Sequence, residues 1–84
     1  MTHAFHSDAV EKVLAELTAR EQASVEAVRR SLETTPGQGR PLPGTDTRVV
    51  EVLPDQSGGR GLSVVYRHDT TLDAVLILWL IAGP

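Results

Sequence analysis

The hydrophobic pattern is strongest at the end of the chain, where nine consecutive apolar residues run from Ala74 to Ala82. A β-strand rises about 3.3 Å per residue, so this run can cross a small domain, but it is far shorter than the roughly 20 residues that a membrane helix needs. A strand that is apolar without alternation is typical of a position covered on both faces. We therefore predict that residues 72–82 form the central strand of a sheet, with Trp79 largely buried in the core. The alternative is that Trp79 reaches the surface of a partner.

The N-terminal part of the chain has apolar residues at helical spacing. Ser7 and Asp8 supply oxygens that can cap a helix, and the pattern after them predicts a helix over residues 8–17. Thr18 and Glu21 have the form of a capping box, which predicts that a second helix begins there. One continuous helix with Thr18 inside it is the alternative. The apolar positions of the two segments are Val10, Val13, Leu14, Leu17, Val25, Val28 and Leu32.

Three shorter stretches have features of β-strands. Residues 3–6 predict a short first strand with Phe5 pointing into the core. Residues 36–44 contain three prolines and three glycines and therefore form a loop, because this composition neither continues a helix nor donates regularly to a sheet. Residues 48–53 and 62–66 then predict two strands joined by a Gly-rich turn.

These elements follow the order β-α-α-β-β-β. Short links join the last three strands, which suits an antiparallel meander. Two helices then cover one face of a curved, mainly antiparallel sheet. The predicted fold class is therefore α+β.

Composition narrows the choice of function. With 84 residues the chain has room for one domain, spanning residues 1–84. A net charge of −3 argues against coating of nucleic acid by bulk electrostatics. The chain has no Cys, and His3 and His6 lack a nearby carboxylate pair, so we predict no metal site and no cofactor. The N-terminus lacks the basic and apolar regions of a signal peptide, which predicts a cytoplasmic protein without membrane contact.

Several short phrases, in this order, resemble the RelE/ParE toxin superfamily over about residues 5–80. The order of predicted elements is also similar: a short first strand, two helices, a Pro- and Gly-rich loop and a terminal apolar strand. The phrases are Phe5-His6, Asp8-Ala9-Val10, Thr35-Pro36-Gly37, Gly39-Arg40-Pro41-Leu42-Pro43-Gly44, Arg48-Val49-Val50 and Gly59-Arg60-Gly61-Leu62-Ser63-Val64-Val65-Tyr66-Arg67. The resemblance implies a RelE/ParE-like fold.

Members of that superfamily are toxins of toxin–antitoxin pairs. RelE-like members cleave mRNA on the ribosome, ParE-like members poison DNA gyrase, and an antitoxin segment that wraps the toxin holds both inactive. The resemblance thus implies a toxin-like protein that binds a cognate antitoxin and inhibits translation or another essential target. The alternative is a non-enzymatic module for protein binding or dimerisation. The expected partners are an antitoxin or a second copy of the chain, and mRNA on the ribosome if the protein is a metal-independent endoribonuclease.

RNA cleavage without a metal needs a base, an acid and cations that stabilise the transition-state phosphorane. The resemblance places Arg48 where the family often has a basic residue at the start of the second strand. Ser63 stands three residues before Tyr66, where the nucleases commonly have Arg. The sequence ends at Gly83-Pro84, without the C-terminal basic and aromatic residues of the nucleases. We therefore expect the family's catalytic residues to be largely absent.

The remaining candidates are arginines and one tyrosine. The candidate catalytic residues are Arg48, Arg67 and Tyr66, and the candidate anion-binding or nucleic-acid-binding residues are Arg40, Arg48, Arg60 and Arg67. Strand parity predicts Arg48 and Arg67 on the same face, away from the helices, with Arg60 curling over it. The alternative is that these arginines are solvated charges at strand edges and that Tyr66 belongs to the core or its rim.

Overall fold

The computed structural model describes residues 2–83, so that Met1 and Pro84 lie outside the described chain. The elements in this range are β1 (His3–His6), α1 (Asp8–Leu14), α2 (Ala19–Thr34), β2 (Arg40–Pro41), β3 (Thr47–Val52), α3 (Pro54–Ser57), β4 (Leu62–Asp69) and β5 (Ala74–Ala82). The order of predicted elements is confirmed. Two short elements are additional: β2 lies in the predicted loop, and α3 lies in the predicted Gly-rich turn.

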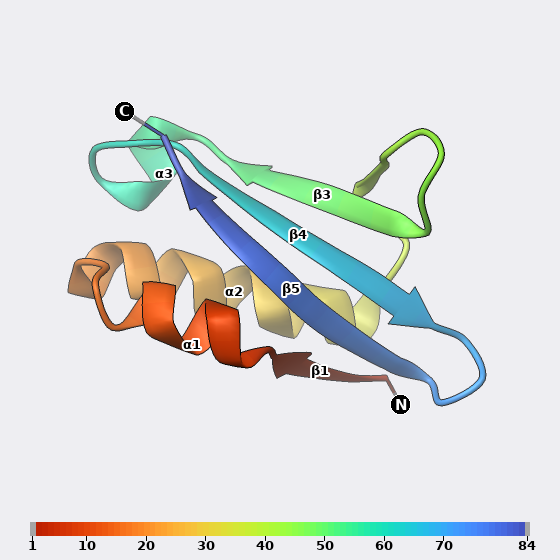
Figure 1. Ribbon diagram of the computed structural model, residues 1–84. Helices are drawn as coiled ribbons and strands as arrows, with labels where there is room; N and C mark the ends of the chain where they lie inside the picture. The colour runs from red at the N-terminus through yellow and green to blue at the C-terminus, as the bar shows by residue number, and fades with distance from the viewer. Residues whose placement is uncertain (1, 84) are drawn as a thin grey trace.

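The strands form one sheet in the order β1-β5-β4-β3-β2 (Figure 1). β1 runs parallel to β5, and the other neighbouring strands are antiparallel. The predicted α+β class with a mainly antiparallel sheet is therefore confirmed. The predicted position of the terminal strand is wrong, because β4 is the central strand and β5 lies between β4 and the four-residue strand β1.

Side-chain caps separate the two main helices. The Ser7 hydroxyl accepts a hydrogen bond from the Val10 amide at 3.2 Å and begins α1. The Glu21 amide donates to the Thr18 hydroxyl at 3.1 Å, and the Thr18 amide donates to the Glu21 carboxylate at 2.9 Å. This capping box satisfies two amides that have no partner within the helix, so α2 starts as predicted. The alternative of one continuous helix is wrong, and α1 ends at Leu14, earlier than expected.

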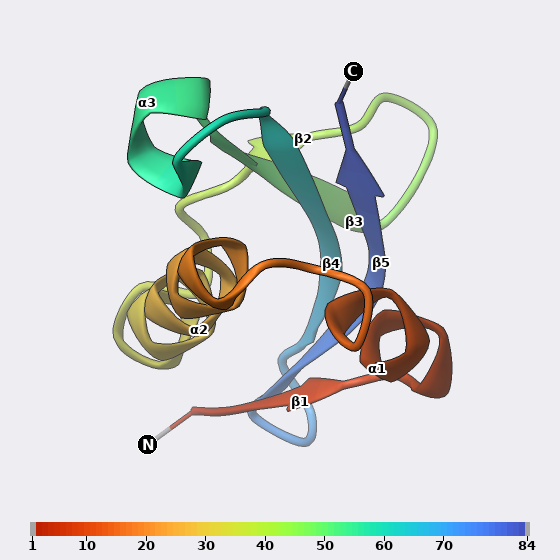
Figure 2. The same ribbon diagram turned by 90° about the vertical axis from the view of Figure 1, so that its left-hand side faces the viewer.

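Both helices bury apolar side chains against the same side of the sheet. Figure 2 shows α2 lying along one face of the sheet and α1 beside β5. The fully buried members of this core are Val10 from α1, Val25 and Leu32 from α2, Val64 and Tyr66 from β4, and Val75 and Ile77 from β5. The helical periodicity of the N-terminal half therefore supplies one layer of the core and the strands supply the other.

A β-bulge changes which way the end of β5 faces. Val65 pairs with Trp79 while the next residue, Tyr66, pairs with Ile77, so Leu78 is an extra residue in β5. Alternation reverses there, and Trp79 points away from the core with 56% of its surface exposed. The prediction of a buried Trp79 is therefore wrong. The Ser7 amide and hydroxyl donate to the carbonyls of Ile77 and Leu78 at 3.0 and 2.9 Å, which satisfies the irregular backbone.

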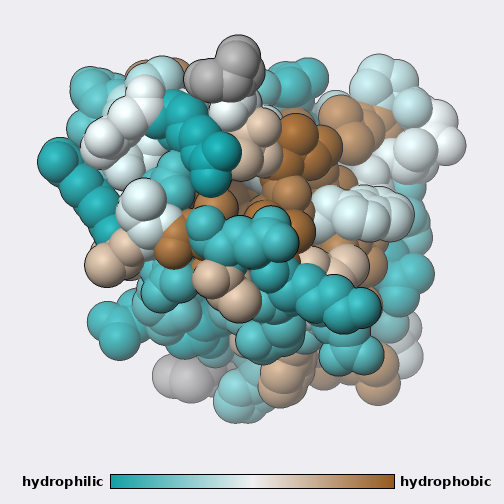
Figure 3. All heavy atoms as spheres, turned by 60° about the vertical axis from the view of Figure 1, so that its left-hand side comes forward, coloured by the Kyte–Doolittle hydropathy of each residue, from teal (hydrophilic) through white to brown (hydrophobic). Residues whose placement is uncertain are grey.

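The sheet face that points away from the helices is called the outer face below. Large apolar side chains project from it with more than half of their surface exposed: Phe5 (56%), Trp79 (56%), Ile81 (58%) and, at the end of β3, Leu53 (55%). Figure 3 shows hydrophobic side chains open to solvent and bordered by hydrophilic ones. The expectation that Phe5 points into the core is wrong, because its neighbour Ala4 takes the buried position. Among residues 2–83, no helix is long and apolar enough to cross a membrane.

Candidate functional site

Arg48 lies on the core side of the sheet. It pairs directly with Tyr66 across β3 and β4, and residues that are opposite each other in a ladder share a face. Its guanidinium donates from Nη1 to the carbonyl of Gly39 at 2.8 Å and to that of Gly37 at 3.4 Å. Arg48 therefore holds the loop between α2 and β2 against the sheet.

Arg67 lies on the outer face, opposite Thr47. Its Nη1 is 3.8 Å from Oδ2 of Asp46. The prediction that Arg48 and Arg67 share a face is wrong, because the register pairs Arg48 with Tyr66 and the side chain of the next residue in β4 points the other way.

The other two candidate cations are also engaged. Arg60 donates from Nε to Glu21 at 2.7 Å, and this hydrogen bond lowers the pKa of the Glu21 carboxyl. Arg40 binds Glu51 on the outer face at 3.0 Å. Arg60 precedes β4 and Arg67 lies near its end, which separates them by about 16 Å of strand. The structure thus does not bring the four candidate arginines together, and their role in anion binding stays a prediction.

Tyr66 is completely buried, which confirms its predicted place in the core. Its hydroxyl donates to the carbonyl of Pro36 at 2.7 Å and accepts from the amide of Gly39 at 2.9 Å. Both bonds tie the loop after α2 to the centre of the sheet. A catalytic role for Tyr66 stays a prediction, and the observed contacts are those of a structural side chain.

Ser63 marks the position where the resemblance implies a phosphate-binding Arg. It lies on the outer face of β4, between Glu51 on β3 and Ile81 on β5. Its neighbours are thus an acid and an apolar side chain. A phosphate at this position would meet apolar surface and a Glu51 carboxylate already paired with Arg40, which together offer no net positive charge to bind an anion.

A cluster on α2 closes the free edge of β1. Arg29 binds Glu26 at 2.6 Å and Glu33 at 3.3 Å. It also donates to the Ala4 carbonyl at 3.2 Å, while Glu33 accepts from the Ala4 amide at 3.3 Å. The four-residue spacing of Arg29 and Glu33 predicts the ion pair from the sequence, but nothing in the sequence indicates that it bonds to a strand.

Glu26 is expected to make stability depend on acid pH. Its hydrogen bond with Arg29 lowers its pKa from 4.5 to about 2. The unfolded chain therefore binds a proton at higher pH than the folded protein, so this contribution is complete above pH 4.5 and is lost as the pH falls towards 2. Because Glu26 is 39% exposed, solvent screens the pair and the loss is about 1 kcal/mol.

Thermal unfolding between these pH values measures this contribution. The Glu26→Gln variant should lose this part of the pH dependence, whereas Glu16→Gln, at an exposed position outside the cluster, should retain it. Equal pH profiles of the two variants would contradict the assignment.

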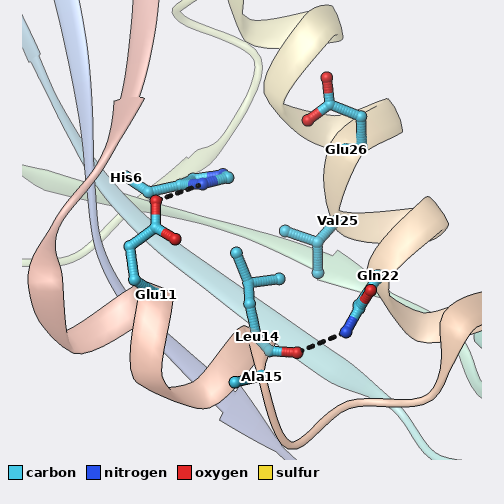
Figure 4. A pocket seen from close by; sticks show the side chains of 7 residues that line it. All are labelled: His6, Glu11, Leu14, Ala15, Gln22, Val25 and Glu26. Carbon is cyan, nitrogen blue, oxygen red and sulfur yellow. Dashed lines mark hydrogen bonds and ion pairs between the residues drawn. The ribbon is translucent and has the colours of Figure 1, made fainter.

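A cavity of ≈ 320 Å³ lies between α1 and α2 (Figure 4). His6 Nδ1 is 3.6 Å from a Glu11 oxygen at its rim, and Gln22 donates to the Leu14 carbonyl at 2.7 Å. His6 Nε2 is buried and has no hydrogen-bond partner within residues 2–83. In the same range, no group of three or more metal-ligating side chains is close enough to hold an ion.

Comparison with known proteins identifies the fold. No protein-family model matches the chain, and no curated protein matches its sequence. The structure matches a chain in the crystal structure of the intact E. coli RelBE toxin–antitoxin complex, with a TM-score of 0.78 over 98% of this chain and 96% of that chain. The protein has a RelE-like fold. At 13% identity the likeness concerns the RelE-like fold alone, so the residues of this chain must be interpreted from their own contacts.

Proposed function

We propose that this protein is the toxin component of a toxin–antitoxin pair, which binds a cognate antitoxin and inhibits translation or another essential process. The observation that carries the proposal is the RelE-like fold over 98% of the chain, matched in a toxin–antitoxin complex. The exposed outer face supports binding of another protein, because apolar patches of this kind mark interaction sites.

The site geometry favours action by binding over catalysis. Arg48 and Arg60 hold a loop carbonyl and a buried carboxylate, and the hydroxyl of Tyr66 is engaged by backbone on both sides. Arg67 is the least tightly paired of the candidate cations, because its nearest carboxylate, that of Asp46, is 3.8 Å away, and it is therefore the one best able to reach a substrate. The second candidate function is therefore a metal-independent ribonuclease that uses Arg67. In such an enzyme, the other candidate arginines would have to leave their present partners to contact RNA.

Expression in a bacterial host, with and without the neighbouring reading frame, tests the proposed function. We expect growth arrest with the protein alone, rescue with its neighbour, and copurification of the two products. We expect Arg67→Ala to change the degree of growth arrest by less than about twofold, because a protein-binding toxin does not use Arg67 to hold phosphate. Loss of a phosphate contact that does contribute to catalysis would reduce activity roughly 5- to 150-fold. Arg30→Ala, at a 75% exposed position on α2, is the matched control.

The outcomes separate the two candidate functions. Cleavage of ribosome-bound mRNA that is lost with Arg67→Ala and retained with Arg30→Ala would favour the ribonuclease. Arrest that survives both substitutions without mRNA cleavage would favour a protein-binding toxin. Normal growth at full expression of folded protein would contradict the toxin proposal.

A further inference from the structure

The outer face is unusual for a sheet that has helices on one side only. Such sheets normally alternate apolar residues towards the core with polar residues towards water. β5 instead places apolar side chains on both faces, and Trp79 and Ile81 are 56% and 58% exposed. Burial of this surface would be favourable by about 25 cal/mol per Å².

Part of each sheet edge is blocked against pairing with a strand of another chain. At one edge, Arg29 and Glu33 occupy the carbonyl and amide of Ala4 in β1. At the other edge, β2 has only two residues, and Pro41 has no amide hydrogen to donate. Side-chain blocks, short edge strands and prolines all prevent edge-to-edge pairing. The outer face therefore offers more apolar surface for association than the partly blocked edges do.

The apolar area of the outer face agrees with that of a standard interface. Phe5, Trp79, Ile81 and Leu53 are each more than half exposed, and together they present about 400 Å². A standard interface buries about 800 Å² on each partner, of which slightly more than half is apolar. The outer face thus supplies the apolar part of one such interface.

The charges of the outer face suit a second copy of the chain. Arg40 pairs with Glu51, and Arg67 lies near Asp46, so the face carries both signs of charge in adjacent pairs. In a two-fold dimer the same patch is present on both sides, and paired charges of both signs can meet without like-charge repulsion. A polyanion such as RNA would find these two arginines already neutralised.

We propose that the free protein forms a two-fold homodimer in which the outer faces of two copies pack together around Trp79. The two sheets then lie about 10 Å apart, the usual spacing of sheets that pack face to face. The dimer covers the apolar side chains that the fold of one copy leaves in water. This inference concerns the free protein and does not depend on the proposed toxin function.

Sedimentation velocity of the purified chain over a concentration series tests the proposed dimer. The wild type should reach twice the monomer mass of 9.1 kDa, with dissociation in the micromolar range. Ile81→Lys, on the outer face, should weaken dimerisation at least about 30-fold. Leu72→Lys, at a 74% exposed position outside the outer face, is the matched control and should dimerise like the wild type.

Trp79 provides an independent measurement, because it is the only Trp in the chain. Its emission should shift to longer wavelength when the wild type is diluted and should already be shifted in the Ile81→Lys variant, with unchanged circular dichroism. A wild-type monomer at about 0.5 mM would overturn the proposal and leave the outer face to a different protein. Two other results would also overturn it: an Ile81→Lys variant that dimerises as tightly as the wild type, or a wild-type dimer whose Trp79 emission does not change on dilution.

Discussion

Replacement of Tyr66 by Ala is expected to remove most of the free energy of unfolding. Tyr66 is the largest fully buried side chain, and its hydroxyl makes two hydrogen bonds to the loop after α2. Removal of a buried aromatic side chain leaves a cavity that costs about 3–5 kcal/mol. A domain of this size has a free energy of unfolding near the low end of about 5–15 kcal/mol. The cost of the cavity is therefore most of the free energy that keeps the protein folded. Circular dichroism and urea titration measure the outcome.

Trp79→Ala is the matched control for this experiment. The two side chains are similar in kind, but Trp79 is 56% exposed and lies on the outer face. Its removal should cost at most about 2 kcal/mol when the urea titration is made at a concentration where the protein is monomeric. An unfolded Trp79→Ala variant, or a Tyr66→Ala variant with the wild-type urea midpoint, would contradict the assignment of these two residues.

Gly39→Ala is expected to destabilise the protein by about 1–3 kcal/mol, the usual cost of overpacking a core. An added Cβ at Gly39 would lie 2.7 Å from Cε1 and from the hydroxyl oxygen of Tyr66. The ring cannot move away easily, because it is fully buried and hydrogen-bonded to Pro36 as well as to Gly39. The midpoint of urea unfolding measures the effect.

Gly37→Ala in the same loop is the control for backbone entropy. A Cβ at Gly37 would meet nothing within 4 Å. Any effect of the added methyl group on the unfolded chain is common to both variants. Equal urea midpoints for Gly37→Ala and Gly39→Ala would show that the ring of Tyr66 does not limit the space at Gly39.

Three of the described arginines contribute mainly to the construction of the fold: Arg29, Arg48 and Arg60. Arg48 and Tyr66 together fix the loop before β2. Arg60 binds Glu21, which also belongs to the capping box of α2, and so connects the start of β4 to the start of that helix. Arg29 closes the edge of β1. The number of arginines in the sequence is therefore larger than the number of positive charges available to bind an anion.

Features that depend on neighbours a few residues apart can be predicted from the amino-acid sequence. The capping box of Thr18 and Glu21, the apolar spacing of α2 and the hairpin links of the last three strands all act over short distances along the chain. These local signals are enough to predict the order of elements and the α+β class. The resemblance of the short phrases to the RelE/ParE superfamily added the RelE-like fold.

The order of the strands and the direction of the side chains on them follow only from the packing of the folded chain. The extra residue Leu78 reverses alternation in β5, so an apolar run that predicts burial on both faces instead exposes Trp79. The register of β3 against β4 likewise sends Arg48 and Arg67 to opposite faces. Because a shift of one residue moves every side chain to the other face, these outcomes depend on packing between strands that are distant in sequence, which no local pattern contains.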